Sequence, residues 1–214
     1  LPCDESDLFA LQQAIGIRQT WLAASTHHNE EEQIIKAHNQ LAAKHPDLLT
    51  IIAPRHPQRG EEIAKLASKS GRIALRSRND KITSETKFYI ADTLGELGLF
   101  YRLSEIVFMG GSLIPHGGQN PLEPARLRCC IITGTHTENF SAVYKDMENL
   151  SICINVKNAL EIADKVNNLM QDSDELTKMQ AQTREWLRGK SGAANKIIDI
   201  IAPIFIPVSV ERKS

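Results

Sequence analysis

The sequence predicts an α/β protein built on a Rossmann-like, doubly wound parallel sheet. Three observations support this class: short apolar runs alternate with longer helical stretches, several helix starts carry capping residues, and polar loops recur directly after the apolar runs. Apolar runs that are short and continuous are typical of strands covered by helices on both faces, which is the situation in a parallel sheet.

The apolar runs give the expected strands, of which the third is the weakest. In chain order these strands are 21–24, 48–53, 72–76, 88–91, 106–109, 129–132 and 151–154. The helical stretches expected around them are 7–15, 29–44, 58–70, 94–103, 121–128, 139–147, 159–170, 172–188 and 193–201. No repeat and no linker-like stretch separates these elements, so we expect one domain over residues 1–214.

Capping residues mark several of the helix starts. A side-chain acceptor followed three residues later by glutamate has the spacing of a capping box. The pairs are Asn29 with Glu32, Thr93 with Glu96, and Asn158 with Glu161. The helix at 121–128 follows Asn120 and begins at a proline, whose missing N–H costs nothing there. The run Glu30–Glu32 is best explained as carboxylates at a helix start, facing the positive end of the helix dipole.

Composition and charge argue against several classes of function. Lys and Arg total 25 and Asp and Glu total 26, so the basic excess of a typical nucleic-acid-binding protein is missing. The longest uncharged run, 106–122, contains Gly, Pro, His, Gln and Asn, and it cannot span a bilayer as a helix. The four cysteines form no CxxC pair, so we expect buried, reduced thiols instead of disulfides or a zinc site.

Polar and glycine-rich loops follow the expected strands. They cover residues 25–32, 54–59, 92–97, 110–124 and 134–136. Ligands of open parallel sheets bind beyond the carboxyl ends of the strands, so these loops are expected to form a nucleotide cradle. No GxGxxG, P-loop or GxSxG motif is present, and the histidines lack metal-ligand spacing. We therefore expect no metal and no cofactor.

Each candidate in these loops has a second explanation. Arg55, held between prolines, is aimed at a phosphate or carboxylate, or it forms a surface salt bridge. Arg59 is better explained as a surface residue at a helix start. Two glycine pairs, 110–111 and 117–118, either bring the backbone close to a ligand or serve only turns. Glu123 either binds two ribose hydroxyls or caps its own helix.

Five loop motifs, taken together and in order, resemble the C-terminal half of the 3-deoxy-D-manno-octulosonic acid (Kdo) transferases of lipopolysaccharide synthesis. The motifs are residues 23–27 (AASTH), 53–59 (APRHPQR), 92–97 (DTLGEL), 110–112 (GGS) and 117–124 (GGQNPLEP). The resemblance covers about residues 7–205. It implies a GT-B glycosyltransferase, in which this chain is the half that binds the donor, CMP-Kdo. The other half would hold the membrane anchor, the site for the lipid A precursor and the carboxylate general base.

The resemblance also implies roles for individual residues. Arg55 would engage the donor phosphate or sugar carboxylate, Asn120 would head a helix facing the phosphate, and Glu123 would bind the ribose. Backbone groups of two loops would contact cytidine and phosphate; these residues are Gly95, Glu96, Leu97, Gly110, Gly111 and Ser112. Weaker candidates are Ser25, His56 and Gln119. Gln119 departs from the histidine of many relatives, which leaves any acid role at that position in doubt because glutamine does not titrate.

The reaction implied is an inverting, metal-independent transfer of Kdo from CMP to a lipid A precursor. The full protein would act at the cytoplasmic face of the bacterial inner membrane, reaching the membrane only through its other half. This chain by itself is expected to be soluble and inactive. Two alternatives stay open: a GT-B donor domain for another nucleotide sugar of the UDP type, which a nucleotide competition series would distinguish, and a non-catalytic nucleotide-binding module, which would show an occluded or unsupported pocket.

Overall fold

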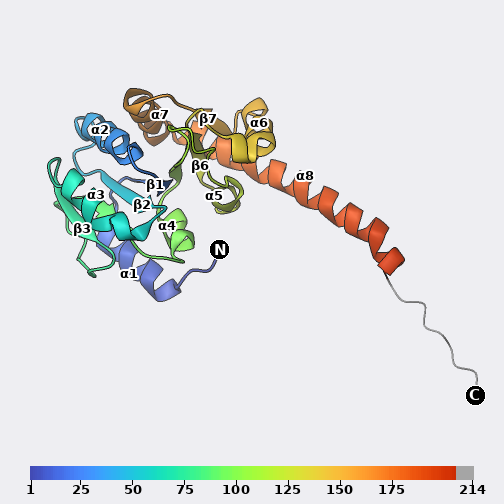
Figure 1. Ribbon diagram of the computed structural model, residues 1–214, viewed down its shortest axis with the longest axis horizontal. Coiled ribbons are helices and arrows are strands. Elements are labelled where there is room, and N and C mark those ends of the chain that lie inside the picture. Colours follow the sequence, from blue (N-terminus) through green and yellow to red (C-terminus); the bar gives the residue numbers. More distant parts are fainter. Residues whose placement is uncertain (206–214) are drawn as a thin grey trace, which may run out of the picture.

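A seven-stranded parallel sheet with helices on both faces forms the body of the molecule (Figure 1), as predicted. The computed structural model describes residues 1–205, with side chains described as far as residue 190. The last residues of the expected domain, 206–214, lie outside the described residues. The strand order is β3-β4-β2-β1-β5-β6-β7, and every neighbouring pair is parallel. From β1 the chain builds β2, β3 and β4 on one side and then crosses back to form β5 on the other side of β1, which places a topological switch point between β1 and β5.

The strands agree with the expected runs to within a few residues at each end. They are β1 (Thr20–Thr26), β2 (Leu49–Pro54), β3 (Arg72–Leu75), β4 (Thr86–Ile90), β5 (Ile106–Met109), β6 (Cys130–Thr133) and β7 (Cys153–Asn155). The helices are α1 (Glu5–Ile15), α2 (Glu30–Ala42), α3 (Gly60–Ala67), α4 (Leu97–Leu103), α5 (Leu122–Arg126), α6 (Ser141–Asn149), α7 (Ala159–Gln171) and α8 (Ser173–Phe205), with 3-10 turns η1 (Pro57–Arg59) and η2 (Glu138–Phe140).

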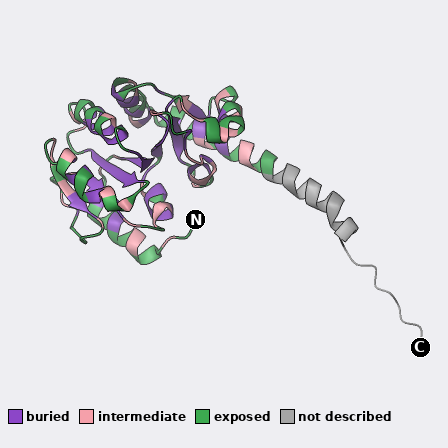
Figure 2. Ribbon diagram, in the orientation of Figure 1, coloured by how far each residue is buried: buried purple, intermediate pink, exposed green. Residues whose placement is uncertain are grey.

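Two apolar cores lie on opposite faces of the sheet, because successive strand side chains point to opposite sides. Trp21 and Ala23 of β1 join α2, α3 and α7 in one core, and Leu22 and Ala24 join α1, α4, α5 and α6 in the other. The central strands are buried along most of their length (Figure 2). Continuous burial of this kind explains why the strand sequences are apolar without alternation.

Several helix predictions need correction. Asn29 adopts a left-handed conformation (φ 73°) instead of the extended one typical of an N-cap, and its side chain makes no capping hydrogen bond. The helix expected at 94–103 begins at Leu97, since the Thr93 hydroxyl donates to Glu96, which also pairs with Arg76. The helix expected at 121–128 is only Leu122–Arg126.

Two further predictions concern the helices in the C-terminal part of the chain. The Asn158 box is confirmed: its side chain accepts a hydrogen bond from the Glu161 N–H at 3.0 Å. The two helices expected at 172–188 and 193–201 are one continuous helix, α8. Its first turns contact one core through Leu176 and Met179, and Trp186 and Leu187 reach the other core. The helix then continues beyond the body of the molecule (Figure 1).

Candidate functional site

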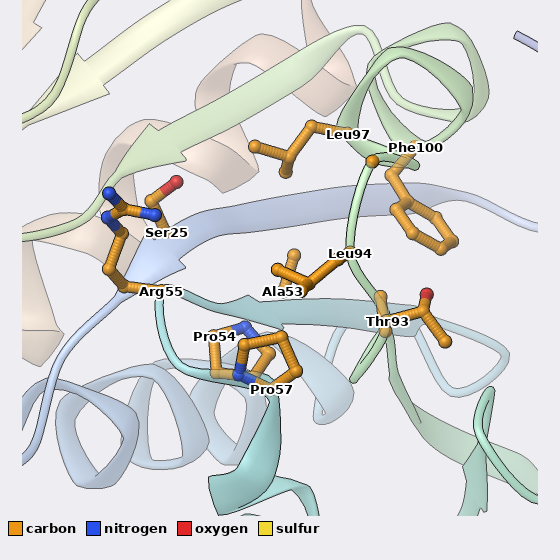
Figure 3. A pocket seen from close by; sticks show the side chains of 11 residues that line it. Ser25, Ala53, Pro54, Arg55, Pro57, Thr93, Leu94, Leu97 and Phe100 are labelled. Atoms are coloured by element: carbon orange, nitrogen blue, oxygen red, sulfur yellow. The ribbon is translucent and has the colours of Figure 1, made fainter.

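A pocket opens at the carboxyl ends of β2 and β4, with β1 behind it (Figure 3). It is a solvent-open hollow with a cavity volume of about 140 Å³, which is smaller than the roughly 300–1,000 Å³ of a typical small-molecule pocket, so it can enclose only part of a nucleotide-sized ligand. The lining residues are Ser25, Ala53, Pro54, Arg55, Pro57, Ala91, Thr93, Leu94, Gly95, Leu97 and Phe100. Its walls are therefore mostly apolar, with one cationic side chain.

Arg55 provides the cationic group of this pocket. Its backbone N–H donates to the carbonyl of Thr26 at 2.9 Å, which fixes the start of the loop, while its side chain is exposed. Among the described residues, no carboxylate lies within 4.0 Å of its guanidinium. In Figure 3 the guanidinium and the Ser25 hydroxyl gather at one end of the pocket. A planar cation without a carboxylate partner at a pocket mouth is suited to bind a phosphate or carboxylate.

The loop that forms the opposite wall is fixed by a residue that sequence reasoning missed. Arg76, at the end of β3, donates to both carboxylate oxygens of Glu96, at 3.1 and 2.6 Å, and also pairs with Asp7. The hydrogen bond from Arg76, followed by that from Thr93, lowers the pKa of Glu96. The Glu96 side chain is therefore engaged inside the protein, whereas Gly95, with φ 81°, and Leu97 face the pocket.

The glycine-rich loop after β5 is arranged differently. The backbone N–H groups of Gly111, Ser112 and Leu113 all donate to the carboxylate of Glu30, at 2.6, 3.0 and 3.0 Å. The N–H of His27 donates to the same carboxylate at 2.9 Å, and Glu30 is fully buried. In this structure an internal carboxylate thus accepts from the Gly111 and Ser112 amides, and their contact with a ligand stays a prediction.

The remaining groups of this loop are also used inside the protein. The Ser112 hydroxyl donates to the Met109 carbonyl and accepts from the Gly134 N–H. A Cβ at Gly110 would lie 2.4 Å from the Ser25 carbonyl oxygen, so glycine is needed there for the close approach of β5 to β1. The glycines of this loop therefore serve contacts within the protein, which favours the second of the two explanations given above.

Histidines cluster on the outer side of the same loop. The His27 ring centroid lies 3.9 Å from that of His116 and 5.9 Å from that of His56, and the Gln119 amide nitrogen lies 3.2 Å from Nε2 of His27. Burial, followed by the nearby His116, His56 and arginine charges, lowers the pKa of His27 to about 4. A neutral His27 accepts a hydrogen bond from Gln119, so both side chains are positioned within the protein.

A second buried acidic residue fixes the loop that carries Arg55. Glu31 accepts from the Thr26 hydroxyl at 3.0 Å and from Arg59 at 2.7 Å, and Arg59 also binds Glu62. Arg59 is consequently a structural cation: it lies just before α3, as expected, but its side chain is mostly buried and is not the surface residue predicted. The glutamates at 30 and 31 do lie in the first turn of α2, but their position at a helix start gave no sign of these partners.

The predicted site residues fall into two groups. Ser25, Arg55, Gly95 and Leu97 line the pocket, and Glu96 lies in its wall loop. The pocket does not include His56, Gly110, Gly111, Ser112, Gln119, Asn120 or Glu123. The Asn120 side chain accepts from the Leu122 N–H at 3.0 Å and so caps its own short helix. Glu123 lies near α4, where its charge adds to burial in raising the pKa of Tyr101.

Metal ligands, membrane-spanning helices and cysteines can be compared with the expectations in the part of the chain that the structure describes. Within it, no group of three or more His, Cys, Asp or Glu residues is arranged to hold a metal ion. None of its helices combines the length and the hydropathy needed to cross a membrane. All four cysteines are free, and Cys129, Cys130 and Cys153 are buried, as expected.

Comparison with known proteins gives consistent relatives. A 3-deoxy-D-manno-octulosonic acid transferase of Haemophilus influenzae is 36% identical over 188 residues, which are 87% of this chain and 44% of that protein. A probable mitochondrial enzyme of the same name from Arabidopsis thaliana is 40% identical over 173 residues, 78% of this chain and 38% of that protein. The chain thus spans less than half the length of these two relatives. No protein-family model matches it.

A solved structure covers the same region. The C-terminal CMP-Kdo binding domain of WaaA from Acinetobacter baumannii is 30% identical, with a TM-score of 0.81 over 85% of this chain and 96% of that one. The C-terminal domain of a group 1 glycosyltransferase (LpcC) of Francisella tularensis, at 16% identity and a TM-score of 0.59, shares the fold. The fold is that of the C-terminal half of a GT-B glycosyltransferase, and the chain belongs to the 3-deoxy-D-manno-octulosonic acid transferase family, in which it corresponds to the C-terminal domain.

Proposed function

We propose that this chain binds CMP-Kdo as the donor domain of a glycosyltransferase that transfers Kdo to a lipid A precursor. The observation that carries the proposal is Arg55, a cation with no carboxylate partner among the described residues, at the mouth of a largely apolar pocket. Family membership supports the identity of the donor, because the relative of known structure is described as a CMP-Kdo binding domain.

The pocket suits the two chemical parts of such a donor. Flat apolar surface from Pro54, Pro57 and Phe100 can pack against a pyrimidine ring, and the backbone at Gly95 offers polar groups at its edge. Arg55 would then pair with the phosphate or the sugar carboxylate. Glu123 is proposed to bind the ribose hydroxyls, and Asn120 to lie near the phosphate, although neither residue lines this pocket.

The chemistry proposed is a single displacement at the anomeric carbon. An acceptor hydroxyl attacks, the bond to the phosphate oxygen breaks, and CMP leaves with inversion of the anomeric centre. Negative charge grows on the departing phosphate, and a positioned guanidinium stabilises that charge without the help of a metal ion. The general base, the acceptor site and the membrane anchor are proposed to lie in the remainder of the enzyme, at the cytoplasmic face of the inner membrane. This chain alone is then inactive in transfer.

Calorimetry with the purified chain tests the proposal. We expect CMP to bind in the presence of EDTA, and UDP to compete poorly. Tighter binding of UDP than of CMP would favour a donor domain for another nucleotide sugar. A folded chain that binds no cytidine nucleotide would contradict donor binding altogether. Turnover of CMP-Kdo by this chain alone would contradict the assignment of the base to another part of the enzyme.

A further inference from the structure

The buried carboxylate of Glu30 occupies a position where an α/β protein usually binds an external anion. Three consecutive backbone N–H groups, of Gly111, Ser112 and Leu113, converge on it, and Gly111 has a positive φ of 68°. Consecutive amides that point into one concavity form an anion-binding nest. The nest lies between the exits of β1 and β5, at the topological switch point of the sheet.

Both oxygens of this carboxylate are fully engaged. Oε2 accepts from His27 and Gly111, and Oε1 accepts from Ser112 and Leu113. Glu30 is not accessible to solvent. An incoming phosphate would have to displace a buried carboxylate that already has four donors, at the cost of leaving that charge unpaired.

We propose that Glu30 is a positioning residue that permanently fills the nest, so that the donor's anionic group is bound by side chains such as that of Arg55 and not by the backbone amides of Gly111–Leu113. This inference rests on the proposed function and specifies how the donor is held. By tying His27 to Gly111–Leu113, Glu30 fixes the ends of β1 and β5 relative to each other. The backbone of Ser25, which lines the pocket, packs against Gly110 of the same junction. Glu30 therefore acts on the pocket through this packing and touches no ligand.

The first experiment uses the wild-type chain and nuclear magnetic resonance. Scalar couplings across hydrogen bonds are measured between the amide nitrogens of Gly111, Ser112 and Leu113 and the carboxylate carbon of Glu30. We expect the couplings in the free chain and, unchanged, in the chain saturated with CMP. Couplings that are absent from the free chain, or that vanish when CMP binds, would overturn the proposal, since the nest would then be open to the ligand.

The second experiment compares variants. Glu30→Ala and Glu30→Gln should weaken CMP binding at least about tenfold, because the glutamine amide can accept from only part of the donor set and presents donors to the rest. Thr50→Val is the matched control: it removes a buried hydrogen bond between β2 and His38 of α2 at the other end of the sheet. It should lower the melting temperature but leave CMP affinity within about twofold.

The outcomes separate this inference from the proposed function. If wild type binds no CMP, the function fails, while the couplings in the free chain still test the occupied nest. If wild type binds CMP and the Glu30 variants lose no more affinity than Thr50→Val, the positioning role is wrong. Should Glu30→Ala not fold, Glu30→Gln and the wild-type couplings decide the question.

Discussion

The loops at the carboxyl ends of the strands fall into two regions with similar polar sequences. The donors of one region face a pocket, and those of the other are bonded inside the protein. On the β2/β4 side, Arg55 is exposed and lines a pocket with Gly95 and Leu97. On the β1/β5 side, the amides of the glycine-rich loop donate to Glu30, and the Ser112 hydroxyl bridges two loops. Donor-rich loops therefore do not by themselves indicate a ligand site. What distinguishes a binding region is whether its donors remain available after the protein has folded.

The largest effect is expected from removing the available cation. Arg55→Ala should weaken CMP binding about 30-fold, or roughly 2 kcal/mol, because a charge-assisted hydrogen bond to the phosphate is lost. Arg55→Lys should recover only part of this, since lysine lacks the planar pair of donors. Calorimetry at constant ionic strength measures both. Unchanged affinity in Arg55→Ala would contradict the inference that the β2/β4 side, and not the β1/β5 side, binds the phosphate.

A smaller effect is expected at Glu123, which lies outside the described pocket. If its carboxylate binds the ribose, wild type should prefer CMP to 2′-deoxy-CMP by about tenfold, and Glu123→Gln should reduce this preference to about twofold. The comparison between two nucleotides cancels general effects of the variant on folding. A preference that Glu123→Gln leaves intact would place the ribose elsewhere and limit the site to the β2/β4 side.

Low pH should destabilise the folded protein through His27, which lies on the β1/β5 side. The unfolded chain binds a proton at this histidine near pH 6.5, whereas the folded pKa is about 4, so the unfolded state holds more protons between these values. The free energy of unfolding should therefore fall as the pH drops from 6.5 to 4. The difference between the two pKa values corresponds to about 3 kcal/mol, and screening by the solvent that reaches the imidazole reduces the expected effect of His27 to about 1–2 kcal/mol.

Urea unfolding at pH 7 and pH 4.5 measures this dependence. His27→Gln should flatten part of it, and the buried His38, whose pKa is also lowered to about 4, supplies an independent part that His38→Gln removes. A pH dependence that is the same in wild type and His27→Gln would show that His27 is not neutral in the folded protein.

The smallest effect is expected for Gln119→His, which introduces the histidine that the resemblance implies for this position. Because the Gln119 side chain donates to His27 and does not line the described pocket, the substitution should change CMP affinity by less than about threefold at pH 7. A larger change, measured by the same calorimetry, would show that position 119 contacts the nucleotide and that the β1/β5 side takes part in binding.

The sheet was predictable because its strands are buried on both faces and therefore continuously apolar. Helix starts were less so. The Asn158 box depends on residues three apart and formed as expected, whereas the Thr93 box failed because Glu96 has a stronger partner in Arg76, 20 residues earlier in the chain. A pattern of neighbouring residues cannot predict a hydrogen bond from a residue that is distant in the sequence.

The site was predictable in part for the same reason. Arg55 follows an apolar strand directly, and its place at the pocket could be inferred from that alone. Glu30 meets Gly111 across 81 residues of sequence, and a glutamate in the first turn of a helix looks identical whether it is solvated or buried. The one available signal was the coincidence of a glutamate after β1 with glycines after β5, which are neighbours in any sheet of this topology.

At each end of the central strand, β1, a single side chain hydrogen-bonds it to neighbouring segments. Before it, Arg18 donates to the backbone carbonyls of Asp47, Leu48, Thr83 and Thr86, which belong to the segments leading into β2 and β4. After it, Glu30 holds the segment that follows β5. A shift in the register of β1 by even one residue would break the hydrogen bonds of both Arg18 and Glu30. The register of β1 against β2, β4 and β5 therefore depends on contacts at two distant points, and a chain with β1 out of register would lose the hydrogen bonds at both.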